Sequence, residues 1–235
     1  MNEGKSNEQI WIEYSHLFND NEFFKEFRTF ITENKLGYGE DQFCVLWDKL
    51  IYSLNKDFSF LEIGVYKGQI LCLIALLAQK YNLKAQIYGV APLYNLSDKT
   101  TIYDEADYKS EIINLHQYFN VDFNIDKQII QGLSTEEHIK NKILNMPQFD
   151  IVYIDGGHEY ETVVSDINLA KKVCKNNGFI VADDASFFKE FEDFSFFLGH
   201  EEVSLAVKDY LENDSNYTEE YCVGHLRVFK KNEYL

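Results

Sequence analysis

Acidic side chains follow two apolar segments of the sequence, at the points where buried strands would end. Asp155 closes the segment DIVYID, and Asp183 and Asp184 close the segment GFIVADD. Carboxylates that meet at neighbouring strand ends raise one another's pKa unless a cation neutralises them. Ligand sets made of oxygen alone suit a hard divalent ion such as Mg²⁺. We therefore predict a site for Mg²⁺, or another hard divalent cation, formed by Asp155, Asp183 and Asp184.

A histidine stands shortly after the first of these acids, behind two glycines. The unperturbed pKa of histidine, about 6.5, suits proton transfer at neutral pH. Coordination to a metal lowers the pKa of a hydroxyl group and makes it a better nucleophile. We therefore predict that Asp155 and His158 are catalytic, with His158 removing a proton from an acceptor hydroxyl. The simpler alternatives are a Gly-Gly turn, helix caps at Asp183 or Asp184, and a structural histidine.

The segment LEIGVYKGQI places an acid and two glycines where a strand would pass into a helix. It fails the dinucleotide-binding pattern G-x-G-x-x-G, because Tyr66 occupies the second glycine position, and it lacks the G-K-[ST] of a P-loop. What remains is Glu62 beside a turn, Gly64 to Gly68, that lets the backbone approach a ligand. A plain glycine turn is the simpler alternative.

The elements that must position these residues alternate between strands and helices. This alternation predicts an α/β fold, a mostly parallel twisted sheet with helices on both faces. An antiparallel edge hairpin is expected at residues 221–229, after a helix at 201–212. Ligands of such sheets bind at the carboxyl ends of the strands, where both candidate sites fall. The expected strands are residues 58–64, 85–90, 127–132, 149–155 and 178–184, and the helices lie at about 68–80, 105–119, 135–145 and 160–175.

The first 55 residues carry apolar side chains at helical spacing, separated by turn signals at FNDNE and LGYGE. We predict an N-terminal helical cap over residues 1–55 and a main domain over residues 56–235. A chain of 235 residues is long enough for one medium domain with a full core.

The charge balance excludes several kinds of partner. Lys and Arg total 22 against 39 Asp and Glu, which gives a formal net charge of −17. Nucleic-acid binding depends on Lys and Arg that neutralise phosphates, so we expect no nucleic-acid partner, and anionic membrane surfaces are disfavoured for the same reason. A small-molecule or glycan acceptor fits better.

Other features of the composition indicate a cytoplasmic protein. The opening segment is polar, and the longest apolar stretch, residues 70–78, is too short to span a bilayer. The four cysteines are scattered without a C-x-x-C pair, which suits reduced thiols.

The pattern E-x-G-x-x-x-G after a first strand resembles the first motif of class I S-adenosylmethionine-dependent methyltransferases. The resemblance implies a Rossmann-like methyltransferase fold, with S-adenosylmethionine bound by Glu62 and by the loop that contains Gly64, Tyr66, Lys67 and Gly68. It also implies that Ser134, after the third strand, lies near the adenine. The family's second acid, at the end of strand two, is replaced here by Ala91, so either Asp98 or a neighbour in the following loop binds the ribose, or ribose recognition is weaker.

Together, DIVYIDGGHEYETVVSDI and NNGFIVADDAS resemble the metal-dependent sugar O-methyltransferases of the macrocin type, which are related to proteins of the cephalosporin-hydroxylase type. This resemblance covers residues 58–185. It implies that Asp155, Asp183 and Asp184 bind the metal and that His158 is the base. The implied reaction is transfer of a methyl group from S-adenosylmethionine to a hydroxyl of a sugar or glycan precursor.

Two alternatives remain open, namely a metal-dependent hydroxylase on the same fold and a non-catalytic binding protein. The residues that would bind the acceptor are the least defined part of the site. The aromatic segment 185–203 predicts a helix face, an aromatic wall over the site or a subunit contact. The last of these alternatives is compatible with a homo-oligomer. Candidate acceptor-side residues are Tyr38, Trp47, His200 and His225, with Phe187, Phe188, Phe191, Phe194 and Phe197.

Overall fold

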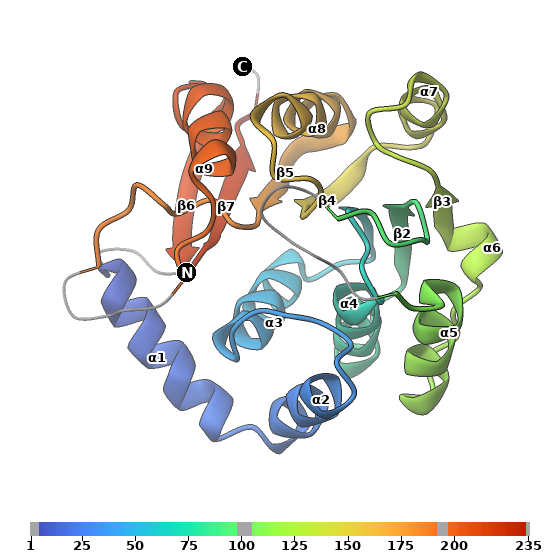
Figure 1. Ribbon diagram of the computed structural model, residues 1–235. Helices are drawn as coiled ribbons and strands as arrows, with labels where there is room; N and C mark the ends of the chain where they lie inside the picture. The colour runs from blue at the N-terminus through green and yellow to red at the C-terminus, as the bar shows by residue number, and fades with distance from the viewer. Residues whose placement is uncertain (1–4, 98–104, 192–196, 234–235) are drawn as a thin grey trace.

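A computed structural model describes residues 5–97, 105–191 and 197–233. Its single sheet has the strand order β3-β2-β1-β4-β5-β7-β6 (Figure 1). The first five strands are parallel, and β7 runs antiparallel to both β5 and β6. This arrangement confirms the predicted Rossmann-like methyltransferase fold. The strands are β1 (Phe58–Ile63), β2 (Ala85–Ala91), β3 (Ile129–Gln131), β4 (Phe149–Ile154), β5 (Cys174–Ala182), β6 (Tyr217–Val223) and β7 (Leu226–Lys231).

Helices cover both faces of the sheet, with α3, α4 and α5 on one side and α7, α8 and α9 on the other (Figure 1). Every residue of β1 and of β4 is buried, as expected for central parallel strands covered on both faces. The helices are α1 (Asn7–Asn19), α2 (Glu22–Glu33), α3 (Gln42–Leu54), α4 (Gln69–Lys80), α5 (Tyr108–Tyr118), α6 (Ile125–Gln128), α7 (Glu137–Leu144), α8 (Tyr160–Val173), α9 (Glu201–Val207) and the π-helical turn η1 (Lys208–Glu212).

The N-terminal helices share one buried cluster with α4 and with one face of the sheet. Trp47 of α3 packs edge-on against Phe60 of β1 and Tyr153 of β4, with ring centroids 5.7 and 5.1 Å apart. Trp47 is fully buried. Trp47 therefore belongs to the core between α3 and the sheet. The expectation that it contacts an acceptor is wrong.

Several element boundaries differ from the sequence-based prediction. The third strand is shorter than expected because α6, capped by the side chain of Asn124, occupies residues up to Gln128. The fifth strand begins earlier, at Cys174, where it pairs with Phe149. No helix forms over residues 185–191, so the expected helical face of phenylalanines is absent from that described stretch.

Strand register fixes where the acids lie. Ile63 pairs with Ile154, and Ile154 pairs with Ala182, so β1, β4 and β5 end at the same edge of the sheet. The amide of Asp155 donates to the carbonyl of Ile63 at 2.8 Å, and the amide of Asp183 donates to that of Ile154 at 2.9 Å. The described residues include no helix long and apolar enough to cross a membrane.

Candidate active site

A cavity of about 740 Å³ lies at the carboxyl ends of β1, β2, β4 and β5. The loop before α3, residues 36–40, forms another wall. Two residues predicted for the cofactor, Lys67 and Gly68, do not line the cavity. The predicted site residues that do are Glu62, Gly64, Tyr66, Ser134, Asp155, His158, Asp183 and Asp184.

The glycine turn after β1 packs directly against the strand that carries Asp155. Gly64 has φ of 102°, and a β-carbon there would lie 1.8 Å from the carbonyl oxygen of Asp155. Only glycine fits this approach. Gly68, with φ of 84°, begins α4, and the Lys67 ammonium donates to the carbonyl of Lys35 at 3.0 Å. Lys67 thus ties the turn to the N-terminal segment.

Glu62 lines the cavity and is 3% exposed. Its Oε2 atom is buried without a hydrogen-bond partner among the described residues. Burial, followed by the charge of Asp183, raises the pKa of Glu62 well above its ordinary value. An unpartnered buried carboxylate oxygen is costly, and an ammonium group that entered the cavity would satisfy it.

The hydroxyl of Tyr153 joins two of the predicted metal ligands. Its oxygen donates to Asp183 and lies 3.2 Å from Oδ2 of Asp155. Burial, followed by the charges of Asp183 and Asp184, raises the pKa of Asp155 well above its ordinary value. Carboxylates crowded in this way offer the oxygen donors that a divalent cation requires.

His225 supplies a cationic side chain beside the paired acids. Its Nδ1 atom lies 2.6 Å from Oδ1 of Asp183 and 3.1 Å from Oδ1 of Asp184. Burial lowers the pKa of His225, but the two carboxylates outweigh it and raise that pKa to about 10. The imidazole is therefore protonated at neutral pH and donates to Asp183.

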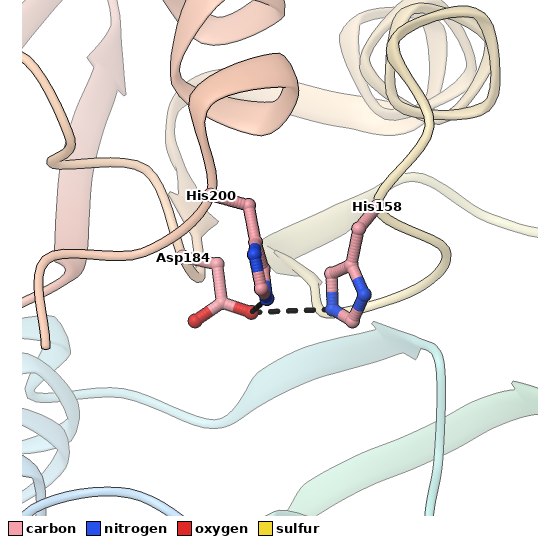
Figure 2. A group of neighbouring side chains, drawn as sticks. All are labelled: His158, Asp184 and His200. Carbon is pink, nitrogen blue, oxygen red and sulfur yellow. Dashed lines mark ion pairs between the residues drawn. The ribbon is translucent and has the colours of Figure 1, made fainter. Parts of the chain in front are cut away.

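His158 and His200 approach the other oxygen of Asp184 (Figure 2). The Nε2 atom of His158 lies 3.2 Å from Oδ2 of Asp184, and Nε2 of His200 lies 3.8 Å from the same oxygen. Burial would raise the pKa of Asp184, but hydrogen bonds from His158 and His225 hold it below its ordinary value. Asp184 is thus an anion at the centre of three imidazoles.

From the sequence, His200 and His225 were expected only on the acceptor side. His225 reaches the acids because the turn between β6 and β7 lies beside the end of β5, where Ala182 pairs with Arg227. The sequence predicted the hairpin at residues 221–229, which contains His225, but only the pairing of this hairpin with β5 brings His225 to the acids.

The end of β2 offers no carboxylate to a ribose. Beyond Ala91 the cavity is lined by Pro92, Leu93 and Tyr94. Asp98, the expected substitute, lies outside the described residues. Ser134 lines the cavity after β3, where the resemblance places the adenine.

Among its described residues, the aromatic segment contributes one phenylalanine to the cavity. Phe197 lines it and packs edge-on against both His200 and His225, with ring centroids 5.2 Å apart in each case. Phe187 and Phe188 are about half exposed and pack against each other. Phe194 lies outside the described residues.

The strand order and the cavity at the carboxyl ends of β1, β2, β4 and β5 define the class of protein. This strand order and this position of the cavity are typical of the class I S-adenosylmethionine-dependent methyltransferase fold. A family model described as a methyltransferase domain matches residues 61–185, just over half of the chain. The chain belongs to this methyltransferase family.

Individual relatives are distant. An uncharacterised protein of Acanthamoeba polyphaga mimivirus is 29% identical over 157 residues, which are 66% of this chain and 64% of that protein. The chain thus spans less than two thirds of the length of this curated relative. A candidate caffeoyl-CoA O-methyltransferase from Staphylococcus aureus has a TM-score of 0.64 at 14% identity, covering 94% of this chain and 100% of that one.

A second solved structure is the O-methyltransferase TomG from Streptomyces achromogenes, involved in tomaymycin synthesis and determined in complex with S-adenosylmethionine. It has a TM-score of 0.56 at 14% identity, and the match covers 91% of each chain. At these identities the likeness concerns the fold.

Proposed function

We propose that the protein transfers a methyl group from S-adenosylmethionine to a hydroxyl of a sugar or glycan precursor, assisted by Mg²⁺ or another hard divalent cation. The observation that carries the proposal is the meeting of Asp155 and Asp183 at the hydroxyl of Tyr153. This acid group lies in the same cavity as the glycine turn after β1. The proposed cofactor site and the proposed metal site would then lie beside the same acceptor molecule.

The cavity residues fit the cofactor. The unpartnered Oε2 of Glu62 suits its ammonium group, and Gly64 and Tyr66 offer a close backbone approach and a ring surface. Ser134 lies on the cavity wall at the end of β3. The presence of S-adenosylmethionine in TomG, which shares the fold, supports the same use of this cavity.

Asp155, Asp183 and Asp184 would hold the hard cation, and their oxygen donors suit it. When bound, such an ion lowers the pKa of an acceptor hydroxyl. His158 is the side chain that would accept the proton, because it lines the cavity and Asp184 orients its ring by accepting a hydrogen bond from Nε2.

The cavity favours an acceptor without phosphate groups. Its volume lies within the range of about 300–1,000 Å³ of small-molecule sites. Among the described lining residues the charged side chains other than histidine are all acidic, and no lysine or arginine is present. Tyr38 and Tyr66 stack with ring centroids 5.5 Å apart and offer apolar surface to a sugar ring.

We also propose that residues 1–55 act as a helical cap that shapes the acceptor side, with residues 56–235 forming the methyltransferase domain. The loop 36–40 of the cap lines the cavity. Arg28 of α2 holds this loop by donating to the carbonyls of Tyr38 and Gly39 at 3.3 and 2.6 Å.

The proposal is tested by calorimetry with S-adenosylmethionine and S-adenosylhomocysteine, followed by methyl transfer to hydroxylated sugars with Mg²⁺ or with excess EDTA. We expect both cofactor forms to bind and turnover to stop in EDTA. Binding of neither form would contradict the function, and normal rates in EDTA would contradict the metal. Turnover that consumed O₂ and a reductant would instead indicate the hydroxylase alternative.

A further inference from the structure

The three residues of Figure 2 include two imidazoles, which are donors of a different kind from the carboxylates proposed for Mg²⁺. We propose that His158, Asp184 and His200 form a mixed nitrogen and oxygen site for a divalent transition-metal ion, with Zn²⁺ as the test ion. Imidazole nitrogen suits Zn²⁺, Fe²⁺ and Ni²⁺, whereas Mg²⁺ prefers oxygen.

The spacing of the three side chains fits a single ion. One ligand atom from each lies within 4.8 Å of the other two. Ligands bonded at about 2.1 Å lie roughly 3.0–3.4 Å apart at octahedral or tetrahedral angles. The Nε2 atoms of His158 and His200 are 3.2 and 3.8 Å from Oδ2 of Asp184. The first of these distances lies within that range, and the second lies slightly above it.

Two of the ligands are held on one rigid piece of backbone. The amide of His200 donates to the carbonyl of Asp184 at 2.9 Å, and Ala185 forms a β-bridge with Gly199. Gly199 has φ of 96°, and a β-carbon there would lie 2.0 Å from the carbonyl oxygen of Asp184. Ser204, one turn into α9, also donates to this carbonyl, at 3.4 Å. Ligands fixed by their supporting contacts lose little freedom when a metal binds.

The third ligand comes from a separate segment, the loop between β4 and α8. The ring centroids of His158 and His200 are 4.4 Å apart, and their nitrogen atoms turn toward the same oxygen (Figure 2). His158 is 8% exposed, and Phe197 packs on the ring of His200. All three ligands also line the cavity, so further coordination positions would face the acceptor space, as in open metal sites.

The test uses the full chain without an affinity tag, stripped of metal by a chelator and held in excess Mg²⁺. Zn²⁺ is titrated by calorimetry, and Co²⁺ provides an absorption spectrum that reports nitrogen ligation. We expect one Zn²⁺ to bind and His200→Gln to weaken it at least ~10-fold, because loss of a supporting group alone costs about 10–100-fold. His158→Gln should act in the same way.

His138→Gln is the matched control, because His138 is an exposed histidine of α7 that does not line the cavity. Far-UV circular dichroism of each variant verifies folding. The site would be overturned by failure of the parent protein to bind Zn²⁺ at about 100 µM, or by affinity unchanged in both His200→Gln and His158→Gln. Neither readout needs S-adenosylmethionine or turnover, so the result is independent of the proposed function.

Discussion

The α-carbon of Gly64 packs so closely on Asp155 that a β-carbon would lie 1.8 Å from the carbonyl oxygen of that acid. The turn proposed for the cofactor and the strand end proposed for the metal are therefore one packed unit. A shift in either segment must move the other, because interiors at this density do not deform locally without cost.

We expect Gly64→Ala to destabilise the protein by more than about 2 kcal/mol, since it adds a clash with backbone to a strained φ of 102°. Chemical denaturation measures the free energy of unfolding. Gly157→Ala is the control, because its added β-carbon would lie 3.2 Å from the end of the Thr162 side chain. Equal losses in the two variants would show that the backbone contact is not decisive.

Tyr153→Phe should impair metal-assisted methyl transfer while keeping the ring that packs on Trp47. The hydroxyl holds Asp155 and Asp183 together, so we expect a higher Mg²⁺ concentration for half-maximal rate and a fall in kcat of about tenfold, or roughly 1.4 kcal/mol. Steady-state rates across a Mg²⁺ series provide the measurement.

Tyr88→Phe is the matched control for that change. Tyr88 packs edge-on against Phe149, and its hydroxyl has no hydrogen-bond partner among the described residues. An unchanged Mg²⁺ dependence in Tyr153→Phe would refute the bridging role of its hydroxyl.

Zn²⁺ should inhibit methyl transfer even in excess Mg²⁺. An ion held by Nε2 of His158 withdraws electron density from the ring and makes the imidazole a poorer proton acceptor, and so this prediction rests on both the proposed function and the transition-metal site. His200→Gln should raise the Zn²⁺ concentration for half-inhibition at least ~10-fold. Binding without inhibition would mean that His158 is not the proton acceptor.

His116 should make the protein less stable in mild acid. Its Nδ1 contacts the carbonyl of Ile112 at 2.7 Å, and its ring stacks on Phe123 with centroids 4.0 Å apart. Its Nε2 is buried and finds no hydrogen-bond partner in the part of the chain that the structure describes. Burial lowers its pKa from 6.5 to about 4. The unfolded chain therefore takes up a proton below pH 6.5 that the folded chain refuses until about pH 4, and stability falls across that window.

At pH 5 this effect amounts to about 2 kcal/mol relative to pH 8. Urea unfolding at a series of pH values, for the parent chain and for His116→Leu, isolates the contribution of this histidine. The free energy of unfolding of the variant should fall less between pH 8 and pH 5. Parallel curves for the two proteins would show that His116 does not couple folding to pH.

The acids of the site could be predicted because they stand at strand ends. Apolar runs specify β1, β4 and β5, and parallel strands joined by helices place their carboxyl ends at one edge. The sequence therefore predicts that Asp155 and Asp183 lie close together. Gly64 was likewise marked by its place after β1, although the sequence did not show which backbone atom it meets.

The histidines around Asp184 depend instead on contacts between distant segments. His225 reaches the acids because β7 pairs antiparallel with β5, and His200 is held by the bridge between Ala185 and Gly199. Neither pairing can be recognised from a short stretch of sequence. Each depends on which strand edge is free and on how distant segments of the chain pack against that edge. The sequence alone determined the sheet and the acids at the carboxyl ends of its strands, and the tertiary structure decided which side chains surround those acids.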